Sequence, residues 1–194
     1  MTTPRSLIAA VAITLFSLAH IPASRAATAV FAGGCFWCME QAFQELDGVH
    51  GVVSGFTGGT LENPAYKGNH KGHYEAIEID YDPTRISYRT LLDHYWRNID
   101  PFDDRGQFCD KGFSYRAAIF TATNAERDLA SASIAAVQER FPRQTVVTQI
   151  LAASTFWPVE EYHQDYYLKN PLRYRLYKGR CGRTKRLKEV WGKK

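Results

Sequence analysis

Short apolar segments of strand character alternate along this chain with segments of helical periodicity, and their order restricts the fold more than any other feature. Strands are expected near residues 28–32, 49–56, 73–81, 115–121 and 145–151, and helices near 35–46, 87–97 and 124–141. The order β-α-β-β-α-β-α-β is typical of a fold built on a split β-α-β unit. We therefore expect an α/β protein (an α+β sandwich): a mixed sheet with a split β-α-β (ferredoxin-like) core and packed helices, followed by a long C-terminal coil.

Residues 1–26 have the composition of a secretory signal peptide. Arg5 precedes an apolar run over residues 7–19, and small residues stand around Ala26, where cleavage is expected. The run of 13 residues is shorter than the roughly 20 that a membrane-spanning helix needs, so an uncleaved anchor is the lesser alternative. Removal of the signal peptide leaves residues 27–194, which we expect to form a single domain. This domain is expected to be secreted into an oxidising compartment, which is the periplasm if the source is Gram-negative.

Charge is distributed unevenly over the expected domain. Residues 169–194 form a basic tail with eleven Lys or Arg and a single acid, Glu189, whereas residues 27–168 have a net charge of −8. A basic tail is compatible with nucleic-acid binding, but an exported protein seldom meets nucleic acid, and the acidic body opposes the phosphate backbone. We therefore expect no nucleic-acid partner, and a tail that folds over the acidic body of its own molecule.

Two cysteines stand where the first strand is expected to end and the first helix to begin, in residues 33–38 (GGCFWC). Unpaired N–H groups and the positive end of the helix dipole favour an anion at that place. The thiolate form of Cys35 is therefore expected to be more populated than in a free cysteine. This position makes Cys35 a candidate nucleophile.

Two structural interpretations compete with a reactive Cys35–Cys38 pair: a disulfide that only stabilises the fold, and half of a zinc site. A structural zinc site usually needs a second closely spaced pair, whereas Cys109 and Cys181 stand alone. A structural disulfide is compatible with export. It would gain nothing from the two aromatic residues between the thiols, which instead suit a pocket for a small apolar group. No metal site is expected.

Further motifs extend this pattern along the chain. They are Asn63-Pro64-Ala65-Tyr66, Gly72-His73-Tyr74-Glu75-Ala76, Tyr81-Asp82-Pro83, Asp110-Lys111-Gly112 with Tyr115-Arg116, and Glu161-Tyr162-His163-Gln164. Together with Gly34-Cys35-Phe36-Trp37, they resemble, in order from Phe31 to about Leu168, the A-type peptide methionine sulfoxide reductases. The tail from Asn170 to Arg183 resembles the ending of one subgroup of that family.

The resemblance implies an oxidoreductase that reduces the S epimer of methionine sulfoxide, free or in proteins, and so repairs damage from oxidative stress. It implies a sulfenic acid on the catalytic cysteine, a following disulfide, no bound cofactor, and electrons from a thioredoxin-like dithiol donor. The chain has no second domain to supply electrons, so the reductant is expected to be a separate protein. We expect a monomer without stable membrane insertion, because the sequence shows neither a dimer signature nor a later apolar run long enough to span.

The same resemblance assigns roles to residues of this chain. Cys35 corresponds to the nucleophile and Glu75 to the proton donor. Tyr66 and Tyr115 correspond to the phenols that hydrogen-bond the sulfoxide oxygen, and Asp110 to a residue that helps to hold the substrate. Phe36 and Trp37 correspond to the wall that receives the methyl group of the substrate. These roles are chemically consistent, because a sulfoxide oxygen leaves only after protonation. Burial would raise the pKa of Glu75 toward the range that a proton donor needs.

Three cysteines are candidates for the resolving thiol that condenses with the sulfenic acid. Cys38 ranks first, because its spacing from Cys35 permits a disulfide with little backbone movement. Cys181 ranks second, in a glycine-containing and flexible-looking segment, with a relay through both thiols as a further option. Cys109 ranks third. Many family members have Gly in place of Cys38, and the segment between the motif tyrosine and glutamate is shorter here than usual.

Two alternative functions explain parts of the pattern. A thiol-disulfide oxidoreductase would use Cys35 and Cys38 but has no need of Glu75 with two phenols. An exported binding module would use the aromatic residues to line a ligand groove. His73 and His163 are interpreted as structural histidines, and residues 160–167 as helix and core.

Overall fold

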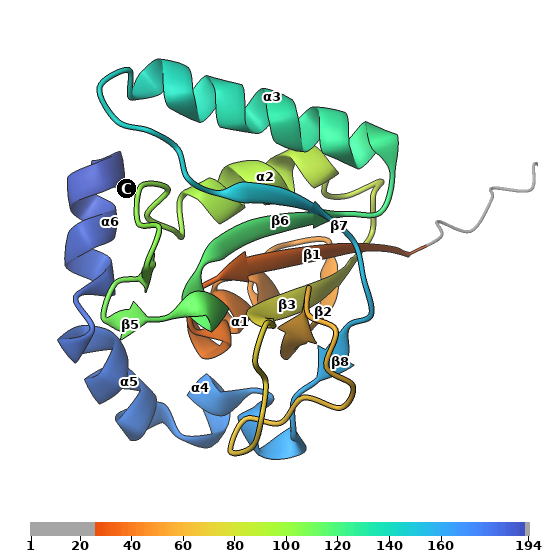
Figure 1. Ribbon diagram of the computed structural model, residues 1–194, viewed down its shortest axis with the longest axis vertical. Helices are drawn as coiled ribbons and strands as arrows, with labels where there is room; N and C mark the ends of the chain where they lie inside the picture. Colours follow the sequence, from red (N-terminus) through yellow and green to blue (C-terminus); the bar gives the residue numbers. More distant parts are fainter. Residues whose placement is uncertain (1–25, 193–194) are drawn as a thin grey trace, which may run out of the picture.

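The computed structural model describes residues 26–192, and a mixed sheet organises them (Figure 1). Its strands lie in the order β7-β6-β1-β3-β2-β8. They are β1 (Ala27–Gly33), β2 (Val49–Thr57), β3 (Tyr74–Tyr81), β6 (Ala117–Thr121), β7 (Gln149–Ala152) and β8 (Trp157–Pro158), and a separate ribbon pairs β4 (Gly106–Gln107) with β5 (Asp110–Lys111). The predicted signal peptide lies, apart from Ala26, outside the described residues.

The described helices differ in how their first turns are capped. They are α1 (Phe36–Gln44), α2 (Tyr88–Trp96), α3 (Asn124–Arg140), α4 (Tyr166–Lys169), α5 (Pro171–Arg180) and α6 (Arg183–Trp191), with 3-10 turns η1 (Phe113–Tyr115) and η2 (Glu161–His163). The Ser87 side chain accepts a hydrogen bond from the Thr90 N–H at the start of α2. Thr123 accepts one from the Glu126 N–H at the start of α3. Such caps satisfy N–H groups that have no partner within the helix.

The sheet contains the split β-α-β unit that the order of elements predicts. β1 and β2 lie on either side of β3, and β3 is antiparallel to both. β1 and β2 are therefore parallel, and α1 connects them. A second connection, through α3, joins the parallel neighbours β6 and β7. The predicted fold class is confirmed.

Alternate residues of the central strands point to opposite faces of the sheet. Phe31 of β1 pairs in register with Ile77 of β3 and Ile119 of β6, and all three belong to the main core together with residues of α1, α2 and α3. Ala32 and Ala118, one residue further along, belong to a smaller cluster on the other face. Phe31, Ile77 and Ile119 therefore lie on the face of the sheet that packs against α1, α2 and α3.

The C-terminal segment departs from the expected long coil. Residues 166–191 fold mainly as α4, α5 and α6, which line one side of the molecule (Figure 1). Pro171 stands at the first turn of α5, where its missing N–H costs no hydrogen bond. The Trp191 indole donates to the Ile99 carbonyl at 3.0 Å, and Arg186 forms an ion pair with Asp100 at 2.6 Å. The basic tail thus folds over the body of its own molecule, as predicted, but it does so as helices.

Two expected boundaries also shift. β7 begins at Gln149 rather than near residue 145, and Tyr115 lies in η1 rather than in β6. Of the helices within residues 26–192, none combines the length and the apolar composition needed to cross a bilayer.

Candidate active site

Cys35 occupies the junction of β1 and α1. It is the residue before the first helical position, and its carbonyl accepts hydrogen bonds from the N–H groups of Cys38 and Met39 at 3.1 and 3.3 Å. The chain turns into the helix at Gly34, which has φ +84° and whose Cα lies so close to Gln107 that a Cβ would approach its side chain to 2.6 Å. Glycine is the residue that adopts this conformation without steric cost. The predicted strand-to-helix position of the motif is confirmed.

Cys35 and Cys38 are both free thiols, 6% and 4% exposed. Burial raises the pKa of Cys35 well above its usual value, and a hydrogen bond to Cys38 acts in the same direction. The same hydrogen bond lowers the pKa of Cys38 to about 6, against the effect of burial and with help from the Arg183 cation. Desolvation thus acts against the expected stabilised thiolate on Cys35, and the lowered pKa belongs to its partner, Cys38.

Glu75 of β3 points into the same junction. The Phe36 N–H donates to Glu75 Oε2 at 3.1 Å, and the side chain is 2% exposed. Burial raises the pKa of Glu75 to about 8, although the hydrogen bonds from Phe36 and Tyr115 act in the opposite direction. At neutral pH the carboxyl group is therefore mostly protonated, as expected for a proton donor.

Tyr66 and Tyr115, the two phenols assigned by resemblance, interact electrostatically with Glu75 and Cys35. Burial and, to a smaller extent, the charges of Glu75 and Cys35 raise the pKa of Tyr66 to about 12. The pKa of Tyr115 is raised by the same causes. Both hydroxyls thus keep their protons over the whole physiological range and act only as neutral hydrogen-bond donors or acceptors.

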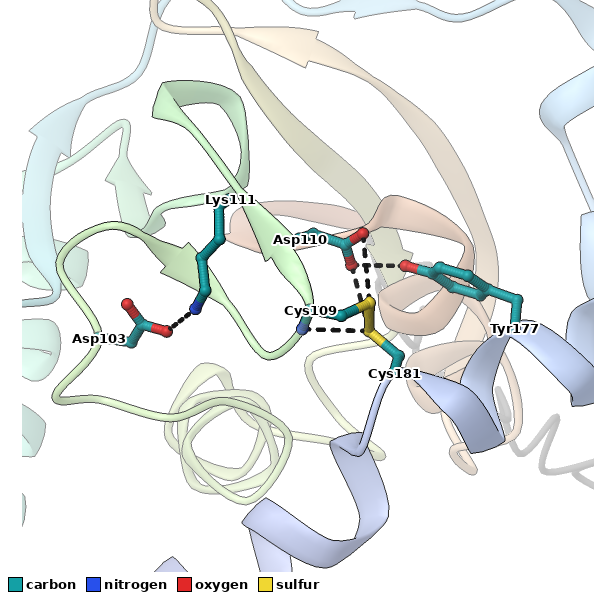
Figure 2. Close-up of a disulfide and its surroundings, with 6 residues drawn as sticks. All are labelled: Asp103, Cys109, Asp110, Lys111, Tyr177 and Cys181. Carbon is teal, nitrogen blue, oxygen red and sulfur yellow. Dashed lines mark hydrogen bonds and ion pairs between the residues drawn. A yellow bond between two sulfur atoms is a disulfide. The ribbon is translucent and has the colours of Figure 1, made fainter.

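Asp110 joins the site to a disulfide (Figure 2). Cys109 and Cys181 are bonded to each other, and Asp110 Oδ1 and Oδ2 lie 3.7 and 3.6 Å from their respective sulfur atoms. The Tyr177 hydroxyl donates to Asp110 Oδ2 and also hydrogen-bonds Cys35. A continuous set of contacts therefore connects Cys35, through Tyr177 and Asp110, to the Cys109–Cys181 disulfide.

The disulfide changes the expected role of the C-terminal cysteine. Cys181 follows α5 directly, is 9% exposed and is already paired with Cys109, so it is neither mobile nor a free thiol in this state. Cys109, Asp110 and Cys181 also offer potential metal ligands within 4.8 Å of one another. Both sulfur atoms are used by the disulfide, so the group has no thiolate ligand to offer.

A hollow of about 400 Å³ opens beside the site. Its lining is Trp37, Tyr66, Lys67, Tyr162, His163, Tyr166, Arg173 and Tyr177. The Trp37 ring stacks on Tyr166 at 3.7 Å between centroids, and the Trp37 indole donates to His163 Nδ1 at 3.1 Å. Trp37 thus forms part of the wall of this hollow, whereas Phe36 is fully buried in the core and does not line it. The role of both residues in receiving a substrate methyl group stays a prediction.

Sequence reasoning missed two participants in this site. His163 was interpreted as structural, yet it holds the Trp37 indole and lines the hollow. Its place in the Glu161–Gln164 motif was the available signal. Tyr177 had no motif signal, because its proximity to Cys35 follows from the packing of α5. His73, in contrast, is buried and contacts the Leu61 carbonyl at 2.8 Å, as a structural histidine does.

The comparisons with known proteins agree with this geometry. A family model described as "Peptide methionine sulfoxide reductase" matches residues 27–194. The chain belongs to the peptide methionine sulfoxide reductase family. It is 49% identical over 187 residues to peptide methionine sulfoxide reductase MsrA 2 of Caulobacter vibrioides, and this alignment covers 95% of each chain. It is 47% identical over 170 residues to peptide methionine sulfoxide reductase MsrA of Bacillus licheniformis, and this alignment covers 86% of this chain and 94% of that one.

Solved structures of the family share the fold of this reductase. Reduced Mxr1 from Saccharomyces cerevisiae superposes with a TM-score of 0.70 at 27% identity, over 77% of this chain and 88% of that one. Methionine sulfoxide reductase A of Corynebacterium diphtheriae gives a TM-score of 0.68 at 29% identity, over 76% of each chain. The fold of this chain is thus shared with a bacterial methionine sulfoxide reductase A and with a yeast protein.

Proposed function

We propose that this chain is an exported reductase of the S epimer of methionine sulfoxide, in which Cys35 attacks the sulfoxide sulfur and Glu75 protonates its oxygen. Reduction of methionine sulfoxide is the activity of the family to which the chain belongs. The observation that carries the assignment of residues is the meeting of a buried thiol pair and a buried, mostly protonated carboxyl group at the start of α1.

The first step follows from the hydrogen bond between the two thiols. Cys35 transfers its proton to the Cys38 thiolate as its sulfur attacks the substrate sulfur, and Glu75 donates its proton to the departing oxygen. The hydroxyl then passes from the substrate sulfur to Cys35 Sγ as the substrate sulfur–oxygen bond and the transient sulfur–sulfur bond break. The products are methionine, a sulfenic acid on Cys35, a neutral Cys38 thiol and an ionised Glu75. Tyr66 and Tyr115 stabilise charge on the oxygen as neutral donors, in the manner of an oxyanion hole.

Cys38 is the resolving thiol in this proposal. It attacks the sulfenic sulfur, its proton returns to Glu75, and the hydroxyl leaves as water with one further proton, so that Cys35 and Cys38 become a disulfide. Cys38 is already hydrogen-bonded to Cys35, whereas Cys181 is held by Cys109. A thioredoxin-like dithiol then restores the two thiols, as in the rest of the family.

Export is supported by residues 1–26, whose charge, apolar run and small residues have the order of a signal peptide. β1 begins at Ala27, directly after the expected cleavage site. Oxidised methionine residues of proteins in that compartment, and free methionine sulfoxide, are the proposed substrates.

The decisive experiment measures NADPH consumption in a thioredoxin-coupled assay with residues 27–194 and each epimer of methionine sulfoxide, beside a Cys35→Ser control. We expect turnover of the S epimer alone, abolished in the control. Mass mapping after one turnover without reductant should find a Cys35–Cys38 bridge. Turnover of both epimers, or a bridge that excludes Cys35, would contradict the proposal.

The alternative function for Cys35 and Cys38 is that of a thiol-disulfide oxidoreductase acting on protein disulfides. Glu75→Gln separates the two functions, because sulfoxide reduction needs the proton of Glu75 and disulfide exchange does not. Loss of insulin-disulfide exchange together with sulfoxide reduction in this variant would favour a general structural role for Glu75.

A further inference from the structure

Cys38 borders a second recess of the molecule. A groove of about 620 Å³ lies between α1, α2, α5 and α6, and Cys38 forms part of its wall. No residue of this groove lines the hollow beside Trp37. Cys38 is therefore reached from a recess that is separate from the hollow lined by Trp37 and Tyr66. A volume of this size suits a small-molecule ligand.

The groove is strongly cationic. Its basic lining residues are Arg97, Lys178, Arg183 and Lys188, and its acidic lining residue is Glu45. Trp191 and Leu187 supply apolar surface beside them. Clefts lined by one sign of charge concentrate ligands of the opposite sign. The groove thus favours a small anion with an apolar portion.

Arg183 makes this preference depend on the redox state of Cys38. Arg183 is 4% exposed, and its guanidinium group donates to the Asn98 carbonyl and lies over the Phe108 ring at 4.6 Å. Within residues 26–192 it forms no ion pair closer than 4 Å, although Asp110 interacts with it electrostatically. The Cys38 thiolate interacts electrostatically with it. When Cys38 enters a disulfide, that negative charge is lost and the buried cation has one compensating charge fewer. The oxidised enzyme therefore attracts an anion to the groove more strongly than the reduced enzyme does.

We propose that the groove beside Cys38 binds an anionic low-molecular-weight thiol, which reduces the Cys35–Cys38 disulfide by attack on Cys38 Sγ. The proposal rests on the proposed function, in which that disulfide is the product of one turnover. It adds a class of reductant and a place for it, separate from the site where methionine sulfoxide binds.

The chemistry balances in two exchanges. The thiolate of the first ligand bonds to Cys38 Sγ, the Cys35–Cys38 bond breaks, and Cys35 leaves with the electron pair and takes a proton from Glu75. The ligand stays bonded to Cys38 with its anionic group among the cations of the groove. A second thiolate attacks the ligand sulfur, so that a ligand disulfide departs and Cys38 leaves as the thiolate beside Arg183. Two ligand thiols have been oxidised, one enzyme disulfide has been reduced, and Glu75 regains its proton from water.

Three thiols that share an ethyl skeleton test the charge preference: 2-mercaptoethanesulfonate, 2-mercaptoethanol and cysteamine, which carry an anionic, a neutral and a cationic end. Each serves as the only reductant for turnover of the S epimer at low ionic strength, and rates are compared per thiolate. We expect the sulfonate to be fastest and the amine slowest. Lys188→Glu should reduce the ratio of the rate with the sulfonate to the rate with 2-mercaptoethanol about fivefold. Lys185→Glu, the same change on α6 outside the groove, should leave this ratio unchanged.

A second measurement locates the bond. Cys35→Ser enzyme is mixed with the disulfide form of 2-mercaptoethanesulfonate, and the adduct is mapped by mass spectrometry; we expect it on Cys38, formed faster than with the disulfide of 2-mercaptoethanol. An adduct on Cys109 or Cys181, or equal rates for the three thiols in every variant, overturns the proposal. The yield of methionine in a single turnover without reductant tests the proposed function and the folding of each variant separately, because it needs no external thiol.

Discussion

At the scale of single residues, the catalytic proposal depends on where protons reside. Burial keeps a proton on Glu75 and on Cys35, whereas the hydrogen bond with Cys35 and the Arg183 cation lower the pKa of Cys38 against the effect of its own burial. This arrangement supplies what the first step needs. The Cys38 thiolate is a base next to the nucleophile Cys35, and the protonated Glu75 is an acid for the sulfoxide oxygen. The low pKa belongs to the partner of the nucleophile, so that Cys35 is activated only while Cys38 is ionised.

The pH dependence of kcat/KM should therefore be bell-shaped. Activity should rise as Cys38 ionises near pH 6 and fall as Glu75 loses its proton near pH 8. Glu75→Gln should remove the upper limb and lower the rate about 10²–10⁴-fold. Steady-state kinetics from pH 5 to 10 check this. An upper limb that persists in the variant would take the acid role away from Glu75.

Cys38→Ser tests the resolving step at the same scale. We expect one methionine per enzyme in a single turnover, at a reduced rate because the base is lost, followed by a persistent sulfenic acid on Cys35 that dimedone labels. The Cys109–Cys181 disulfide does not attack, because it holds no thiol. A Cys35–Cys181 bridge in this variant would show that the C-terminal cysteine resolves instead.

At the scale of elements, the Cys109–Cys181 disulfide fastens the end of α5 to the β4–β5 ribbon. The two cysteines are 72 residues apart in sequence. Tyr177 precedes Cys181 by one helical turn and Asp110 follows Cys109, so the hydrogen bond between them lies beside the covalent link. The disulfide therefore positions two side chains that reach the active site.

The double variant Cys109→Ser with Cys181→Ser should lower the free energy of unfolding by about 2–4 kcal/mol, because a link across a loop of this length restricts the unfolded chain. Urea unfolding measures this. In the same variant, a single turnover should still produce the Cys35–Cys38 disulfide. Failure to form this disulfide would show that Cys109 and Cys181 take part in the reaction itself.

At the scale of the whole molecule, the basic C-terminal helices complete the core of an acidic body. Trp191 is 8% exposed, contacts Phe141 at 5.3 Å between ring centroids and donates to the Ile99 carbonyl. The tail is thus part of the domain, and residues of α6 form one wall of the groove beside Cys38.

Trp191→Ala should reduce the free energy of unfolding by about 3–5 kcal/mol, since it removes a large buried ring and leaves the Ile99 carbonyl without its donor. Lys185→Ala on the exposed side of α6 is the matched control, with an expected change within about 0.5 kcal/mol. Equal effects of the two substitutions would mean that α6 contributes little to the core.

The proposed export has its own measurement at this scale. Expression of the full chain in a Gram-negative host, followed by fractionation and intact-mass analysis, should yield a periplasmic species that begins at Ala27. A membrane-bound species of full mass would instead support the uncleaved anchor.

The sequence by itself determined the features that depend on neighbours along the chain. The split β-α-β order, the Ser87 cap of α2 and the place of Cys35 between a strand and a helix follow from periodicity and capping, which act over a few residues. The motifs around Cys35, Tyr66, Glu75 and Asp110 likewise identified the family, because their residue types and order are read directly from the chain.

Only the tertiary structure decided what depends on contacts between distant residues and on desolvation. The pairing of Cys109 with Cys181, the contact of Tyr177 with Cys35 and the approach of Arg183 to Cys38 join segments 72 to 145 residues apart. Burial raises the pKa of Cys35 against the helix terminus, and the contacts of Cys38 with Cys35 and Arg183 lower the pKa of Cys38 instead. Local sequence specifies which groups are present; the packed fold decides which of them are charged and which of them meet.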